Sequence, residues 1–112
     1  SNESYILEIN SFFVKTTASK DKQGNPKTFN INVTVNVKFI DNENIERNKG
    51  FVENINYNND ENKFSLKQYE NSLIENLTEK IIDNLLIFLQ SISSEKSNAS
   101  LTGNIGYTSK KQ

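Results

Sequence analysis

The sequence predicts a two-layer α+β fold, in which an antiparallel three-stranded meander packs against one long C-terminal helix. Polar and apolar residues alternate without a break over residues 28–40, which is the period of a strand with two unlike faces. Alternating segments flank this strand on both sides, with turn residues between them. A long segment with apolar residues at spacings of three and four follows, as in a helix that covers a sheet.

The first strand is predicted over residues 4–14. Leu7, Ile9 and Phe13 fall in phase on one face of this strand. The Gly-Asn-Pro sequence that follows is typical of a turn. We therefore expect residues 15–27 to form a long two-stranded protrusion or a loop that leads into the second strand.

The second strand, residues 28–40, shows the strongest pattern in the chain. A tight turn is predicted at residues 41–44, and a third strand over residues 45–57. Gly50 within the third strand indicates a bulge or a weak edge. The apolar face of the second strand consists of Phe29, Ile31, Val33, Val35, Val37 and Phe39.

A helix is predicted from Ser65 to about Ile92. Ser65 as the N-cap and Gln68 three residues later match a capping box, and Phe64 is expected to pack on Tyr69 as a hydrophobic staple. An apolar stripe along this helix should cover the sheet. The stripe consists of Leu66, Tyr69, Leu73, Leu77, Ile81, Leu85, Phe88 and Ile92.

The second half of the predicted helix carries more apolar residues than a small sheet can cover. Residues 81–89 are apolar around nearly the whole helix. Ile82, Leu86 and Leu89 are therefore candidate contacts with a partner, and packing within the core is the alternative.

We expect a single α+β domain over residues 1–92 and a polar C-terminal tail over residues 93–112. The tail is rich in Ser, Asn, Gly and Lys, which is typical of a flexible segment. Leu101, Ile105 and Tyr107 nevertheless fall in phase for a short strand, which a sheet edge or a neighbouring molecule would order.

Composition argues against most enzyme classes. The 112 residues include no Cys, His, Met or Trp, so thiol nucleophiles, imidazole bases and the usual soft metal ligands are missing. We expect no catalytic residues, no metal and no cofactor. Thirteen basic residues balance 14 acidic residues, which gives no indication of nucleic-acid binding.

Charge is distributed unevenly along the predicted fold. Residues 15–27 carry four lysines against one aspartate, whereas residues 41–62 carry six acids against two bases. The meander places the first of these segments at the same end as the start of the helix, whose free N–H groups attract anions. Lys20, Lys22 and Lys67 are therefore candidate contacts for phosphate or another anion. The alternative is that they are solvated lysines that protect strand edges.

The order of these parts resembles the C-terminal two thirds of the lipopolysaccharide-assembly lipoprotein family, LptE (rare lipoprotein B). The resemblance covers about residues 4–92. It rests on YILEINSFFVKTTASKDKQGNPKTFNINVTVNVKFI and, after a third strand, on KQYENSLIENLTEKIIDNLLIFLQSI. It implies a non-enzymatic, periplasmic-side outer-membrane protein that sits as a plug inside a large β-barrel partner and contacts lipopolysaccharide during export.

The resemblance also implies which residues contact lipopolysaccharide. The basic residue that the family carries on the tip of the turn aligns with Lys22, and its second basic residue aligns with Leu66, beside which Lys67 is the nearest base. The family's lipidated cysteine, first strand and first helix have no counterpart in this sequence. We therefore expect a processed or truncated form, whose incomplete sheet would favour a homodimer or recruitment of the tail.

Another hypothesis places the chain in a different functional class. A small extracytoplasmic ligand-binding or enzyme-activating adaptor would use a deep apolar pocket between sheet and helix. An enzyme would have to build its site from carboxylates and lysines alone, such as a buried lysine beside a carboxylate in a cleft.

Overall fold

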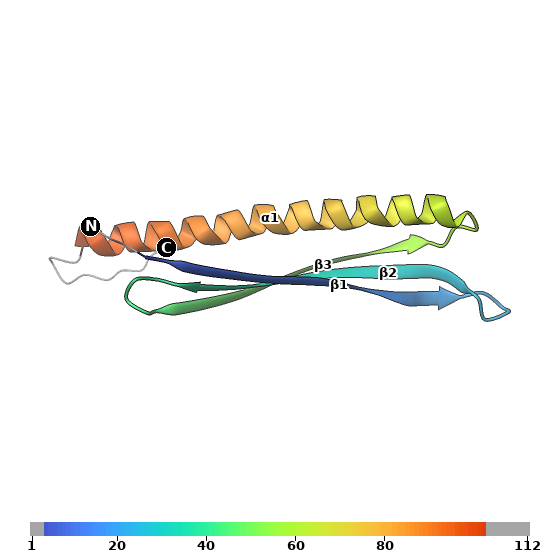
Figure 1. The fold of residues 1–112 in the computed structure, drawn as a ribbon, viewed down its shortest axis with the longest axis horizontal. Helices are drawn as coiled ribbons and strands as arrows, with labels where there is room; N and C mark the ends of the chain where they lie inside the picture. Colours follow the sequence, from blue (N-terminus) through green and yellow to red (C-terminus); the bar gives the residue numbers. More distant parts are fainter. Residues whose placement is uncertain (1–3, 103–112) are drawn as a thin grey trace. The chain divides into compact units, whose positions relative to one another are not determined.

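The computed structural model describes residues 4–102 of the chain. Three strands form one antiparallel sheet in the order β1-β2-β3, and helix α1 follows them (Figure 1). The predicted α+β fold, a three-stranded meander packed against one long C-terminal helix, is confirmed. The elements are β1 (Ile6–Lys20), β2 (Pro26–Ile40), β3 (Glu46–Asn58) and α1 (Lys63–Thr102).

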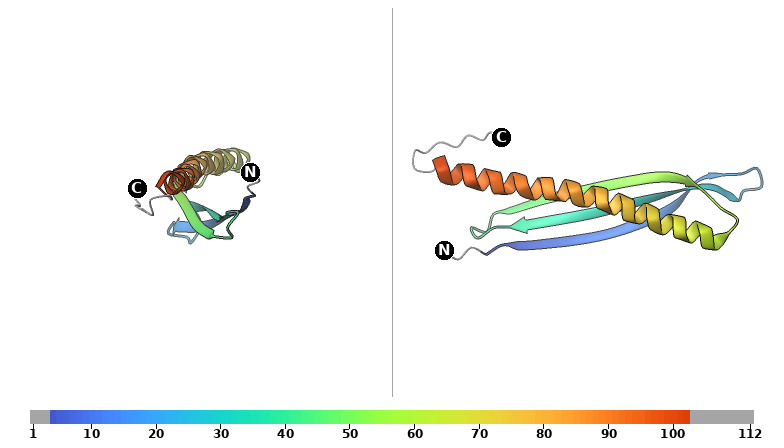
Figure 2. Two further views of the ribbon diagram at one scale, coloured as in Figure 1. Left: turned by 90° about the vertical axis from the view of Figure 1, so that its left-hand side faces the viewer. Right: turned by 90° about the horizontal axis from the view of Figure 1, so that it is seen from above.

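The chain divides into two units after Ile81. The first unit contains the whole sheet and residues 63–81 of α1, and the second begins at Ile82 and continues the helix. Within the first unit, the helix lies over one face of the sheet (Figure 2). This face is called the inner face below, and the opposite face is called the outer face.

The core of the first unit forms between β2 and the helix. Ile31, Val33, Val35 and Val37 on the inner face of β2 are all buried, the most buried being Ile31 at 1% exposure. Burial of each such side chain contributes about 1.5–3 kcal/mol to the free energy of unfolding. The other buried apolar residues of this unit are Phe51, Tyr57, Leu66, Leu73, Leu77 and Ile81.

Strand β1 is longer than predicted. It continues to Lys20, whose partner in the β1–β2 ladder is Pro26. The expected two-stranded protrusion is therefore the end of this hairpin. The Asp21 carboxylate closes its turn by accepting the N–H groups of Gln23 and Asn25, both at 2.9 Å, and Gly24 takes a positive φ of 87°.

Of the two alternatives predicted from Gly50, the bulge is wrong, whereas β3 is an edge strand of the sheet. The β2–β3 ladder is regular through the pair of Asn36 and Gly50, and the irregular register lies instead in β1, between Thr17 and Lys20. A Cβ atom at Gly50 would lie 3.2 Å from the Asn36 side-chain oxygen. Glycine at this position therefore leaves room for the neighbouring amide.

The turn between β2 and β3 is built around a buried carboxylate. Asp41 is 3% exposed, and its Oδ1 atom accepts the N–H groups of Glu43 at 2.8 Å and Ile45 at 3.0 Å. Its Oδ2 atom lies 3.5 Å from the Arg47 guanidinium. Asn44 adopts the positive φ that the turn requires. These contacts fix the point at which the chain reverses.

Helix α1 begins earlier than predicted. Asn62 is the N-cap, because its side-chain oxygen accepts the N–H groups of Phe64 at 3.1 Å and Ser65 at 3.0 Å. The predicted Ser65 cap is therefore wrong. Phe64 lies inside the first turn and is 71% exposed, rather than preceding the cap as the predicted staple with Tyr69 requires.

Helix α1 also ends later than predicted. It does not stop near Ile92 but continues to Thr102, so residues 93–102 are helical. Leu101 accordingly lies in the helix and not in a short strand. Ile105 and Tyr107 lie outside the described residues.

Candidate functional site

One end of the first unit combines the β1–β2 turn with the start of α1. The loop after β3 is fixed against the start of β2, because Asn59 donates its N–H to the Lys27 carbonyl at 2.9 Å and its side-chain amide to the Pro26 carbonyl at 3.0 Å. Lys20 ends β1 and Lys22 lies in the turn, and both are exposed. The fold therefore places these two lysines at the same end as the helix start, as the topology predicts.

The helix start offers fewer free N–H groups than expected. The N–H groups of Phe64 and Ser65 are bound by Asn62, and Leu66 donates its N–H to the Asn62 carbonyl. Lys63 points to the preceding loop, where its ammonium lies 3.3 Å from the Asp60 carbonyl. An anion at this end would therefore rely on lysine side chains more than on backbone N–H groups.

A polar cluster that the sequence interpretation missed lies next to this end, between sheet and helix. Glu70 is 8% exposed, and its Oε2 atom accepts a hydrogen bond of 2.6 Å from the Tyr57 hydroxyl and lies 2.8 Å from the Lys15 ammonium. Lys15 also lies 4.2 Å from the centre of the Phe29 ring. The cluster thus joins β1, β2, β3 and α1.

Opposite pKa shifts fix the charge of this cluster. Burial raises the pKa of Glu70, but the hydrogen bonds from Lys15 and Tyr57 and the charges of Lys15 and Lys67 lower it more, so the pKa lies below its usual 4.5. Burial, then the hydrogen bond to Glu70 and its charge, raise the pKa of Tyr57. Near neutral pH the carboxylate is ionised and the phenol is neutral.

These shifts favour a structural role for the cluster. A group that exchanges protons at neutral pH needs a pKa near 7, and both shifts move away from that value. Glu70 and Lys15 therefore bind one another rather than forming an acid–base pair. Lys67 is exposed on the helix, and its positive charge also helps to lower the pKa of Glu70.

Spacing contains a signal for this cluster. Glu70 lies four residues after Leu66 and three before Leu73, on the apolar stripe, where the sequence prediction placed Tyr69. Tyr69 is 51% exposed and packs edge-on against Tyr57. A carboxylate on an apolar helix face indicates a cationic partner on the sheet, and Lys15 shares the face of Phe13.

The candidate partner contacts lie in the second unit. Ile82 is 46% exposed and Leu86 is 51% exposed, whereas Leu89 is half-buried. Leu85 and Ile92 on the same helix are buried. Two of the three predicted partner residues are therefore available at the surface of this unit.

Apolar residues are also exposed along β1. Every described residue of this strand is exposed, on the inner and the outer face alike. The apolar alternation of β1 therefore does not lead to burial, because residues 63–81 of the helix bury the inner face of β2 and not that of β1. The large apolar residues concerned are Ile6, Leu7, Ile9, Phe12, Phe13 and Val14, which are 43–55% exposed.

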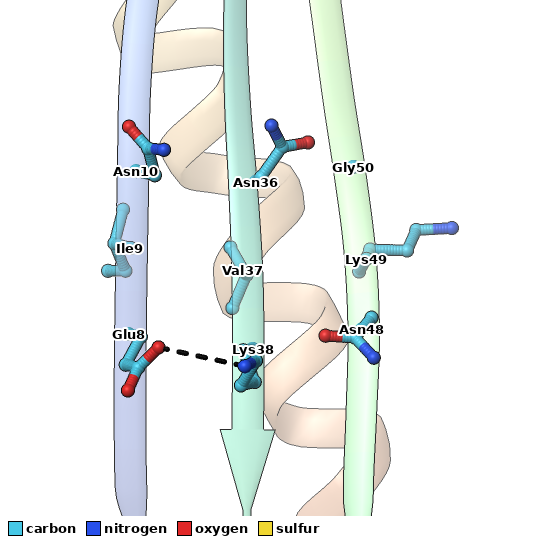
Figure 3. A pocket seen from close by; sticks show the side chains of 9 residues that line it. All are labelled: Glu8, Ile9, Asn10, Asn36, Val37, Lys38, Asn48, Lys49 and Gly50. Carbon is cyan, nitrogen blue, oxygen red and sulfur yellow. Dashed lines mark ion pairs between the residues drawn. The ribbon is translucent and has the colours of Figure 1, made fainter.

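An open hollow lies across the three strands (Figure 3). It is lined by Glu8 and Lys38 together with Asn10, Asn36 and Asn48. The Lys38 ammonium lies 4.0 Å from the Glu8 carboxylate. Ile9, Val37, Lys49 and Gly50 complete its lining, and Gly50 has no side chain to fill the space. This hollow is open and is lined by polar and apolar residues alike, so it is not the deep apolar pocket that an adaptor would need.

Residues 4–102 contain neither a membrane-spanning helix nor a cluster of metal ligands. No stretch of helix in this range combines the length and the apolar character needed to cross a bilayer. No group of three or more acidic side chains in the same range is arranged to hold a metal ion. The chain matches no protein-family model, and no curated protein matches it.

Proposed function

We propose that the chain is a non-enzymatic subunit of outer-membrane lipopolysaccharide assembly, which plugs a β-barrel partner on the periplasmic side and contacts lipopolysaccharide through its basic end. The proposal rests on the resemblance to the LptE family. The structural observation that supports it best is the exposure of apolar side chains on both faces of β1 and at Ile82 and Leu86. A plug inside a barrel meets protein on nearly every side, so such residues would find partners there.

Lysines at one end of the first unit support the contact with lipopolysaccharide. Lys20 and Lys22 lie at the β1–β2 turn, and Lys67 lies on the helix that begins at the same end. All three are exposed. Phosphate groups on a glycolipid headgroup are the ligands that such lysines would bind.

Charge reversal tests this contact. The Lys22→Glu, Lys67→Glu double variant should bind lipopolysaccharide vesicles about tenfold more weakly at low salt, because each reversal replaces attraction by repulsion. The control is Lys38→Glu, Lys49→Glu, which changes the net charge equally on residues away from this end. Unchanged affinity of the first variant, or equal loss in both, would contradict the assignment.

Co-purification from outer membranes tests the contact with a barrel partner. The chain should co-purify from outer membranes with a large barrel protein, and Leu86→Lys should reduce the recovered barrel protein, since a charge replaces an exposed apolar contact. Recovery of the chain without any barrel protein would contradict the plug hypothesis. A ligand-binding adaptor, the alternative from the sequence, finds no enclosed apolar pocket in the hollow of Figure 3 to support it.

A further inference from the structure

Strand β1 has one edge without a partner. It pairs with β2 from Ile6 to Lys20, and no other strand of residues 4–102 lies on its opposite edge. The free edge is 15 residues long and presents a row of backbone N–H and C=O groups. Such an edge is a template for another strand unless a charge, a proline or a bulge blocks it.

Blocking features are scarce along most of this edge. The only charged residue between Ile6 and Val14 is Glu8, there is no proline in β1, and the irregular register lies beyond Thr17. Large apolar side chains instead occupy both faces of this section and remain exposed. A strand that pairs here must therefore bring apolar residues to both faces of the sheet.

The sequence of β1 itself meets this requirement. Apolar residues are arranged symmetrically about Asn10, with Leu7 and Phe13 three positions away on the inner face and Ile6 and Val14 four positions away on the outer face. In an antiparallel pair related by a two-fold axis, residues equally distant from the axis oppose one another on the same face.

We propose that two copies of the chain pair antiparallel through β1, with the two-fold axis at Asn10. Leu7 of one copy then opposes Phe13 of its partner, and Ile6 opposes Val14. The two Asn10 amides face one another and can exchange a hydrogen bond. Each apolar pair occurs twice because of the symmetry, so the sheet continues from one copy into the other.

Other positions of the axis are less favourable. An axis at Phe12 would oppose Ile9 to Lys15, whose ammonium is bound to Glu70. An axis at Val14 would oppose Phe13 to the same lysine. With the axis at Asn10, Glu8 opposes Phe12, so like charges do not face one another.

Cysteine substitution tests both the pairing and the register. Because the chain has no cysteine, a single Asn10→Cys variant can form a disulfide only between two copies. Directly opposed residues lie about 4.5–5.5 Å apart between Cα atoms, within the range that a disulfide spans. Under mild oxidation we expect this variant to convert mainly to a species of twice 12.8 kDa.

Matched controls use the neighbouring positions. Glu8→Cys and Phe12→Cys oppose one another and not themselves, so each alone should cross-link about tenfold more slowly than Asn10→Cys. An equimolar mixture of these two variants should form the mixed dimer rapidly. Faster cross-linking of either control alone than of Asn10→Cys would overturn the proposal.

The unmodified chain supplies the second measurement. Sedimentation should show a dimer, and Leu7→Glu should weaken association about tenfold by removing two cross-strand pairs. Val52→Glu introduces the same charge at an exposed valine of the other edge strand, β3, and should leave association unchanged. A monomer at about 1 mM chain, or equal effects of both variants, would overturn the proposal. Both results are independent of the lipopolysaccharide assay.

Discussion

Strands β1 and β2 have the same length and lie side by side, yet they differ completely in burial. Each has 15 residues. Ile31 on β2 is 1% exposed, whereas Ile9 on the same inner face of β1 is 51% exposed. Helix residues 63–81 cover β2, which is the central strand, and leave the apolar residues of β1 uncovered.

Alternation of polar and apolar residues therefore does not decide burial by itself. This alternation predicts a strand with two unlike faces, and the neighbouring elements determine whether the apolar face is covered. Lys15 of β1 contacts the helix through its ion pair with Glu70. The exposed apolar residues of β1 are available to partners.

The largest expected effect compares two isoleucines. Ile31→Ala should lower the free energy of unfolding by about 2–5 kcal/mol, because it leaves a cavity in the core. Ile9→Ala should lower it by about 0.5 kcal/mol or less in dilute solution, because that side chain is half exposed. Urea unfolding followed by circular dichroism measures both values. Similar losses in the two variants would show that β1 is covered in solution.

Removing the charge of Glu70 tests the attachment of β1. Glu70→Gln should lower the free energy of unfolding by about 1–3 kcal/mol, since the buried oxygen loses its charge-assisted bond with Lys15. Glu75→Gln on the exposed surface of the same helix is the control and should change it by less than about 0.5 kcal/mol. Equal effects would indicate that the ion pair adds nothing to stability.

Acid should weaken the same attachment by a smaller amount. The pKa of Glu70 is lowered in the folded chain, so its contribution is present above the usual 4.5 and is lost as the pH falls through the lowered folded value. The free energy of unfolding should therefore fall more steeply below pH 4.5 in the wild type than in Glu70→Gln. Parallel curves in urea unfolding measured at several pH values would contradict this expectation.

Much of the fold could be predicted because local signals agreed with the final arrangement. The period of two in β2, the Gly-Asn-Pro turn and the apolar stripe of α1 each gave the correct element. The ends of α1 could not be predicted in the same way. The contacts of Asn59 with β2 position the loop so that Asn62 caps the helix, and polar composition hid the helical residues 93–102, where neither Gly nor Pro occurs.

The candidate site was less predictable because it depends on contacts distant in sequence. Lys20 and Lys22 could be placed at one end from topology alone. The hydrogen bonds from the first helix N–H groups to Asn62 could not be predicted in this way, because they depend on the residue at which the helix begins. Glu70 stood on the apolar stripe, but its partners Lys15 and Tyr57 come from two different strands.

The turn at Asp41 fixes the register between β2 and β3. Inserting or deleting a single residue between β2 and β3 would shift their alignment by one position, and a shift by one exchanges the faces of a strand. Because the β1–β2 ladder keeps β2 in place, the shift would fall on β3, and its buried residues Phe51 and Tyr57 would turn away from the helix. The buried Asp41 carboxylate, which fixes the turn, therefore determines which face of β3 meets the helix.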